Sequence, residues 1–423
     1  MQINSVIYFV IFCMILAYCL IKSWLSRDKA EIWSPITMIV LTLGYYVVKP
    51  SCGNLDLFSA NNAPNQQLFY ISSLLFFISI LVAFKRTSGG TFNKWNQYFN
   101  TDNAPTISVF LFLFALLCYV PFRGFRYSID VNDATIMSDR VGLVSYFIDL
   151  ISLFVAASCI AFVGLKRKTG LGFKNKAIFL IILYLSLVIF IVAGFRFRIV
   201  ILLLAMATVY HLYPQPRSIN YKVFVPLAIV MYLGFAIMDT ARTYGAGIDL
   251  ETAQSVSLSQ AYEGASESES VCCFSINVID AYSRNADYIY FEPLLTAVLM
   301  PLPRAFFPWK PDAGYLKDIQ IRTLGDASGG AACLSYVEGY ISFGIFGVIL
   351  YGLLVGWLCK KIWSNYRNNP DSIGAILLLA LFNGFCYVWI SRGYMAAAFN
   401  SLIYFVVMPF WLTGLINKFK KYH

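Results

Sequence analysis

Apolar residues gather along the chain in runs long enough to cross a membrane. A spanning helix needs about 20 mostly apolar residues, and short polar stretches separate runs near this length along most of the sequence. We therefore expect an all-α polytopic membrane protein with about 11 transmembrane helices. The pattern predicts them at residues 3–21, 32–48, 67–84, 106–122, 141–164, 177–195, 198–213, 222–239, 338–359, 373–391 and 396–416.

Composition supports the same class of protein. Hydrophobic residues make up 59% of the 423 residues and charged residues only 13%, whereas an ordinary soluble domain carries about 25% charged residues. This deficit excludes a disordered chain and argues strongly against a soluble enzyme.

Basic residues indicate the orientation of the helices. With the N-terminus outside, the inner loops hold 19 basic and 4 acidic residues, and the rest of the chain holds 13 basic and 18 acidic residues. Cytoplasmic loops carry an excess of Lys and Arg, so this bias places the C-terminus in the cytoplasm. The first run is followed, not preceded, by basic residues, which favours a spanning helix over a secretory signal. The net charge of +10 is therefore explained by the cytoplasmic side, and we expect no nucleic-acid partner.

One connection is far longer than the others. Residues 240–337, hereafter the long loop, separate eight predicted helices within 1–239 from three within 338–423, and they lie on the outer side. Residues 274–300 of this loop form either an amphipathic helix or a segment that re-enters the membrane. Four prolines between Pro301 and Pro311 exclude a regular helix there. Because so long a loop is usually functional or disordered, its aromatic residues favour an ordered cap.

Charged residues near membrane depth gather at the outer ends of the predicted helices. Such charges are expensive and mark candidate sites, although an arginine at a helix end also snorkels to lipid headgroups. A guanidinium group binds phosphate through two parallel hydrogen bonds. We therefore expect a lipid diphosphate to be bound by Arg196, Arg198 and Arg304, with Arg392 and Arg123 as weaker candidates.

A transfer reaction from a diphosphate needs charge stabilisation and one carboxylate that accepts a proton. Glu338 follows the long loop at the start of the ninth predicted helix and is the expected catalytic acid. Asp239, at the end of the eighth, is its rival. Asp149, deeper in the fifth, is expected to be a structural partner of an arginine. The residues expected to bind the glycan are Trp309, Tyr340 and Tyr394.

Other conspicuous residues are expected to be structural. The ten cysteines show no ligand spacing, and the only histidines are His211 and His423. We therefore expect neither a metal site nor a cofactor. Gly352 and Gly356 form a GxxxG spacing that favours close helix packing.

Three stretches of sequence carry a family resemblance. They are Pro303-Arg-Ala-Phe-Phe-Pro-Trp-Lys-Pro311, Glu338-Gly-Tyr-Ile-Ser-Phe-Gly-Ile-Phe-Gly347 and the turn Gly194-Phe-Arg-Phe-Arg198. Together with a single large outer loop late in the chain, they resemble the bacterial oligosaccharide repeat-unit polymerases, the O-antigen polymerase family. The topology agrees over nearly the whole chain, and the motifs lie mainly within 301–356.

The resemblance implies a GT-C-like helical fold in the bacterial inner membrane, with a periplasmic N-terminus and long loop. It implies a metal-independent glycosyltransferase that moves a growing glycan from one undecaprenyl diphosphate to a new lipid-linked repeat unit. Donor, acceptor and membrane lipid would be its partners, together with a chain-length regulator. The product would be a surface polysaccharide, either O-antigen or capsule.

Two alternatives use related substrates. An O-antigen ligase would transfer the glycan to lipid A core, but such ligases place a His in the large outer loop, which here has none. A lipid-linked oligosaccharide flippase is not an enzyme. It needs a cationic cavity open to both sides, and neither the outer location of the charges nor the long loop fits that requirement.

Overall fold

The structure is a computed structural model. It describes residues 3–53, 66–122, 147, 149–165, 172–192, 196–219, 222, 242–243, 247–248, 267–285, 288–299, 302, 307, 309, 314–324 and 332–422. Almost all of these residues are helical, as the all-α class predicts. Among them, the only strand pairing joins β1 (Arg242–Thr243) to β2 (Gly247–Ile248) in a two-residue antiparallel ladder.

The N-terminal half of the chain contains helices before the strand pair. They are α1 (Ile3–Trp24), η1 (Glu31–Trp33), α2 (Pro35–Leu43), η2 (Gly44–Val48), α3 (Lys49–Gly53), α5 (Gln66–Arg86), α6 (Asn93–Asn96), α7 (Ala104–Tyr119), η3 (Val120–Phe122), η5 (Leu150–Ser152), α10 (Leu153–Gly164), α11 (Gly172–Val192) and α12 (Arg196–Leu212). After the strands come α16 (Glu267–Asn285), α17 (Glu292–Leu299), α18 (Gly314–Leu324), α19 (Ser335–Asn368), α20 (Ile373–Ser391), α21 (Met395–Leu402), η6 (Ile403–Val407) and α22 (Met408–Tyr422).

The protein has the helices of a multi-pass membrane protein. Among the described residues, 6 helical stretches are long and apolar enough to cross a membrane: Ser5–Trp24, Gln66–Arg86, Phe173–Val192, Ser335–Asn368, Ile373–Ser391 and Met395–Phe419. Shorter apolar helices cover Ala104–Tyr119, Leu150–Gly164 and Phe197–Leu212. Every predicted run falls at least in part on helical segments except 222–239, which lies almost wholly outside the described residues. The total of about 11 spans therefore stays a prediction.

Local sequence explains several helix boundaries and irregularities. Ser34 precedes Pro35 at the start of α2, and its side-chain oxygen accepts a hydrogen bond of 3.4 Å from the N–H of Thr37. A polar cap followed by proline is a favoured way to begin a helix. The π-helical segments η2 and η6 interrupt regular helix. Such bulges often accompany functional sites.

The chain forms two compact units. Unit 1 comprises Met1–Thr91, Glu267–Asn365 and Cys386–Asn400, and unit 2 comprises Phe92–Ser266, Tyr366–Phe385 and Ser401–His423. The described part of the long loop from Glu267 onward therefore belongs to unit 1, together with the start of α19 and the turn between α20 and α21.

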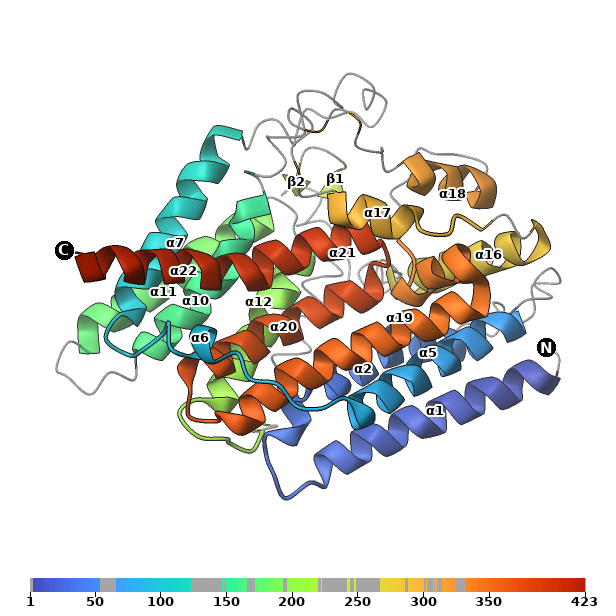
Figure 1. The fold of residues 1–423 in the computed structure, drawn as a ribbon, viewed down its shortest axis with the longest axis horizontal. Coiled ribbons are helices and arrows are strands. Elements are labelled where there is room, and N and C mark those ends of the chain that lie inside the picture. Colours follow the sequence, from blue (N-terminus) through green and yellow to red (C-terminus); the bar gives the residue numbers. More distant parts are fainter. Residues whose placement is uncertain are drawn as a thin grey trace. The chain divides into compact units, whose positions relative to one another are not determined.

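In unit 1, α1, α5 and α19 run side by side (Figure 1). The glycines of α19 allow close approach to α5. A Cβ on Gly352 would lie 2.6 Å from the carbonyl oxygen of Phe76, and one on Gly356 would lie 2.9 Å from the Cβ of Ala83. The packing role predicted for this GxxxG spacing is thus confirmed. Helix α16 packs on α5, α3 and α18, so it lies against the helices of unit 1.

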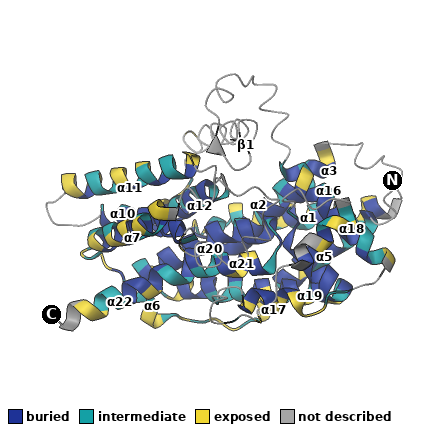
Figure 2. Ribbon diagram, turned by 90° about the horizontal axis from the view of Figure 1, so that it is seen from above, coloured by how far each residue is buried: buried dark blue, intermediate teal, exposed yellow. Residues whose placement is uncertain are grey.

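In unit 2, α10 is the central helix and packs on α7, α11 and α12. Nearly every residue of α10 is buried, whereas α11 exposes large apolar side chains such as Leu180, Ile181 and Tyr184 (Figure 2). A helix that is apolar on all sides is normally enclosed by its neighbours. The exposed apolar face of α11 is what a lipid-facing helix presents.

Candidate functional site

The helix that carries Glu338 is broken within the expected span. Phe343 has φ −144° and ψ 25°, and Gly344 has φ 62° and ψ −147°, so neither residue is helical. The conformation of Gly344 is essentially restricted to glycine. This corrects the expectation of one continuous helix from residue 338. Glu338 lies on a short helical segment, residues 335–342, that precedes the break.

Two further glycines allow the chain to fold back at this break. A Cβ on Gly339 would lie 2.9 Å from the carbonyl oxygen of Gly347, and one on Gly347 would collide with the backbone of Gly339. The two backbones are therefore in direct contact, which leaves no room for a side chain. All three glycines of the motif Glu338–Gly347 have a conformational or steric reason to be glycine.

Glu338 is completely buried, with 0% of its side chain exposed. The hydroxyl of Tyr315, in α18, donates a hydrogen bond of 2.7 Å to its Oε1. The backbone N–H of Met395, the first residue of α21, donates to its Oε2. A carboxylate at the N-terminus of a helix is stabilised by the helix dipole. Glu338 thus joins a helix of the long loop to the start of another helix.

Tyr315 is suited to remain a donor to this carboxylate. Burial, followed by the charge of Glu338, raises the pKa of Tyr315 above its ordinary value. Its hydroxyl is therefore protonated at neutral pH and keeps its hydrogen for Oε1. Tyr394, which precedes Met395, also has a raised pKa, chiefly because it is buried.

The turn between α20 and α21, residues 391–395, is bonded to the residues before α19. The N–H of Gly393 donates to the carbonyl oxygen of Cys333 over 2.6 Å. A Cβ on Gly393 would lie 2.6 Å from the backbone of Leu334, so only glycine fits there. Leu334 in turn donates its N–H to Ser275 Oγ of α16 over 2.9 Å. Glu338 and the 391–395 turn therefore have fixed relative positions.

Arg392 connects this turn to the N-terminus of α16. Its guanidinium lies 2.9 Å from Oε1 of Glu267, and both side chains are partly exposed. Next to Glu267, Ser268 accepts a hydrogen bond of 3.3 Å from Lys49. The ammonium of Lys49 also lies 4.9 Å from the ring centroid of Tyr45. Basic groups from two other elements thus flank the first turn of α16.

A pair of tyrosines lies beside this polar cluster. The hydroxyls of Tyr46 and Tyr387 share a hydrogen bond of 2.8 Å. Tyr46 belongs to the π-helical segment η2, so the irregular helix sets the direction of its side chain. Together with Arg392, Glu267 and Lys49, they form a partly accessible polar region in unit 1.

Arg198 has a different environment, in unit 2. Its side chain is 3% exposed, and its Nη2 lies 2.8 Å from Oδ1 of Asp149. The arginine partner expected for Asp149 is therefore present. Arg196 starts α12, but its side chain lies outside the described part of the structure.

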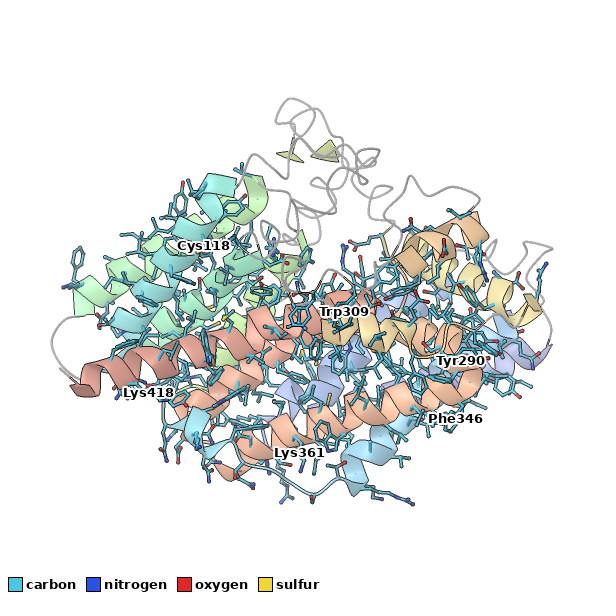
Figure 3. All side chains as sticks on the ribbon, turned by 45° about the horizontal axis from the view of Figure 1, so that its top comes forward. Cys118, Tyr290, Trp309, Phe346, Lys361 and Lys418 are labelled. Carbon is cyan, nitrogen blue, oxygen red and sulfur yellow. The ribbon has the colours of Figure 1, made fainter. Side chains whose placement is uncertain are left out.

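The remaining predicted residues are distributed differently. Tyr340 is buried and packs edge-on against Tyr288, with ring centroids 6.5 Å apart. Trp309 is 67% exposed and lies beside Phe307 (Figure 3). The structure brings Glu338, Tyr340, Tyr394 and Arg392 together in unit 1. Three predicted residues lie outside the described residues, namely Asp239, Arg123 and Arg304.

Sequence reasoning missed Tyr315 and Glu267 as partners of predicted site residues. Tyr315 is 23 positions from Glu338, and Glu267 is 125 positions from Arg392. No helical or strand periodicity connects positions so far apart. Lys49, a basic residue at the outer end of a predicted span, carried a further sequence signal that could have drawn attention to the partners of Arg392.

The fold and these charges define a polytopic helical membrane protein with a polar site where the long loop meets the helix ends. Among the described residues, no group of three or more His, Cys, Asp or Glu side chains is placed to hold a metal ion. The sequence matches no protein-family model, and comparisons with curated proteins and with solved structures found no similar protein or fold.

Proposed function

We propose that the protein is an oligosaccharide repeat-unit polymerase, a metal-independent glycosyltransferase of the bacterial inner membrane. One observation carries the proposal. Two helices of the long loop are bonded directly to charged residues at the ends of other helices, through Tyr315–Glu338 and Glu267–Arg392. Its helices α16 and α18 thus cover a polar site, which is the arrangement that an enzyme acting at headgroup depth requires. A flippase has no need for such a cap.

The proposed orientation follows from the charge bias. The N-terminus and the long loop are periplasmic, and the C-terminus is cytoplasmic. Donor and acceptor, both linked to undecaprenyl diphosphate, would then meet the cap from the outer leaflet. A GT-C-like arrangement of about 11 spans belongs to the same proposal, as does contact with a chain-length regulator.

The proposed reaction is displacement of a diphosphate by a sugar hydroxyl. The acceptor oxygen bonds to the anomeric carbon of the donor glycan, and the bond from that carbon to undecaprenyl diphosphate breaks. The hydroxyl proton goes to a carboxylate, and arginines stabilise the charge on the leaving diphosphate. Among the predicted arginines with described side chains, Arg392 is partly exposed and is paired with Glu267 of the cap. Arg196, Arg198, Arg304 and Arg123 remain further candidates.

Glu338 is the proposed base, with Asp239 as its rival. In the described structure the hydroxyl of Tyr315 occupies the position that an acceptor hydroxyl would take at Oε1. Proton transfer to Glu338 therefore requires that α18 moves and that the acceptor replaces Tyr315 as donor. If α18 stays in place, Glu338 acts instead as a positioning residue for the cap and for α21.

A clean deletion in the bacterium that carries the gene tests the proposal. We expect lipid A core to carry at most one repeat unit, and wild-type complementation to restore long chains. A ladder of long chains in the deletion would contradict the polymerase. Loss of even single-unit capping would instead favour the ligase or the flippase.

A further inference from the structure

Helix α17 of the long loop exposes an apolar stripe. Phe291, Leu294, Leu295 and Val298 follow the i, i+3, i+4, i+7 spacing of one helical face, and all four are exposed, Phe291 by 66%. Pro293, Thr296 and Ala297 are the buried side of the same helix. A water-soluble helix shows the reverse arrangement, with apolar residues facing inward.

The segment before α17 is attached to the break in α19. The break frees the carbonyl oxygen of Ile341 from regular helical bonding, and the N–H of Ile289 donates to it over 3.0 Å. The ring of Phe291 packs on Phe343, with centroids 4.9 Å apart. Tyr288 covers Gly344, where a Cβ would lie 3.0 Å from its hydroxyl. The segment thus fills the space beside the break.

A second exposed apolar stripe lies on α19, just after Phe343, which Phe291 contacts. Phe346, Leu350, Leu354 and Trp357 are exposed at helical spacing along this candidate span. Tyr290 packs on Phe343, and Figure 3 places Tyr290 and Phe346 in the same part of unit 1. Figure 2 shows exposed residues on both helices. Because α19 is long and apolar enough to cross a membrane, we expect its exposed stripe to face lipid, and the contact of Phe291 with Phe343 brings the start of α17 next to it.

We propose that residues 288–299 are embedded in the acyl region of the bilayer as a plug beside the broken helix. A backbone carbonyl without a hydrogen-bond donor is strongly unfavourable in lipid, and the bond from Ile289 supplies that donor. Glu292 is the only charged residue of the segment and stands at the start of α17. At 1.5 Å per residue, α17 is about 12 Å long, far short of the roughly 30 Å hydrocarbon core. The segment therefore enters the membrane without crossing it.

Spin labels on purified protein in liposomes test this placement. The parent variant is Cys52→Ser, since Cys52 is an exposed cysteine. Leu295→Cys reports on α17, and Phe346→Cys on α19 is the lipid reference. Ile321→Cys is the matched control, because it is an exposed apolar residue on α18 of the same loop with exposed Asp318 and Arg322 nearby. The signal of the labelled parent is subtracted from each.

We expect the label at 295 to behave like that at 346, with frequent collisions with oxygen and few with a water-soluble nickel chelate. The label at 321 should show the opposite pattern. A label at 295 that matches 321 would overturn the proposal. The measurement does not depend on glycosyl transfer, so its outcome is independent of whether the protein is a polymerase.

Discussion

The hydroxyl of Tyr315 donates a hydrogen bond of 2.7 Å to Oε1 of Glu338. This bond joins α18, in the long loop, to the short helical segment before the break in α19. The other carboxylate oxygen accepts from the backbone of Met395. Any movement of α18 therefore changes the environment of the Glu338 carboxylate, which we propose as the base.

Replacing Tyr315 separates the two roles of Glu338. Tyr315→Phe removes the donor and leaves the carboxylate, and we expect polymer to persist if Glu338 is the base. Glu338→Gln should abolish polymer in either case. Its cost in folding stability should be about 1.5–3 kcal/mol, because the amide weakens charge-assisted hydrogen bonds. Chain length on gels and melting temperature in detergent measure the two effects.

The outcome that would remove Glu338 as the base is specific. If Tyr315→Phe and Glu338→Gln lose polymer to the same extent at equal protein level, Glu338 is a positioning residue. Full-length polymer from Glu338→Gln would eliminate both roles of Glu338. If Asp239→Asn then abolished polymer at normal protein level, the assignment of the base would move to Asp239.

Breaking the ion pair between Arg198 and Asp149 should destabilise unit 2. Asp149→Leu leaves a buried guanidinium without this carboxylate, which costs about 3–5 kcal/mol for a buried pair. The double variant Arg198→Met with Asp149→Leu removes both charges, and we expect it to restore much of the lost abundance. Immunoblots of membranes and thermal melts in detergent measure these differences.

The same double variant tests the diphosphate role expected for Arg198. A folded double variant that makes normal polymer would show that Arg198 is structural. A folded double variant without polymer would support phosphate binding. If the double variant lost as much stability as Arg198→Met and Asp149→Leu together, that result would contradict the described pairing.

Arg392 can be tested without a large effect on folding. Its partly exposed pair with Glu267 should contribute at most about 1 kcal/mol. Arg392→Lys keeps the charge but loses the planar pair of donors, so we expect shorter chains at unchanged abundance. Glu267→Gln is the matched control for loss of the ion pair alone. Normal chain length with Arg392→Ala at normal abundance would place the diphosphate elsewhere.

Two glycines in helices should respond oppositely to alanine. A Cβ on Gly352 would lie 2.6 Å from the carbonyl oxygen of Phe76, so Gly352→Ala should destabilise by roughly 1–3 kcal/mol through overpacking. A Cβ on Gly44 would have nothing within 4 Å. Gly44→Ala should be neutral or stabilising by up to about 1 kcal/mol. Equal melting temperatures for both variants would contradict the close contact of α19 with α5.

Reporter fusions check the proposed orientation. A fusion at Ser266, in the long loop, should report a periplasmic position, and one at Lys168, between predicted inner helix ends, a cytoplasmic position. A fusion at Asn368, at the end of α19, should agree with Lys168. The same compartment for Ser266 and Lys168 would reject the orientation and, with it, the periplasmic site.

The membrane class, the position of most helices and two packing relationships could be predicted from the amino-acid sequence. Runs of apolar residues and a deficit of charge are properties of local composition, so they need no knowledge of the fold. The role of Gly352 follows from its spacing to Gly356, since both lie on one helical face. The need of Asp149 for an arginine follows from the cost of an isolated charge at membrane depth. The amino-acid sequence did not show that this arginine is Arg198.

The position of the break in α19 and the surroundings of Glu338, in contrast, depend on how distant segments of the chain pack together. A single glycine does not interrupt an apolar run, so hydropathy predicts one helix through Gly344. At the break, Tyr288 covers Gly344 and the N–H of Ile289 donates to the carbonyl of Ile341. Likewise, Glu338 meets Tyr315 and Arg392 meets Glu267 because helices of the long loop fold onto other helices. Contacts between residues so far apart in the chain arise from packing, which no spacing in the sequence records.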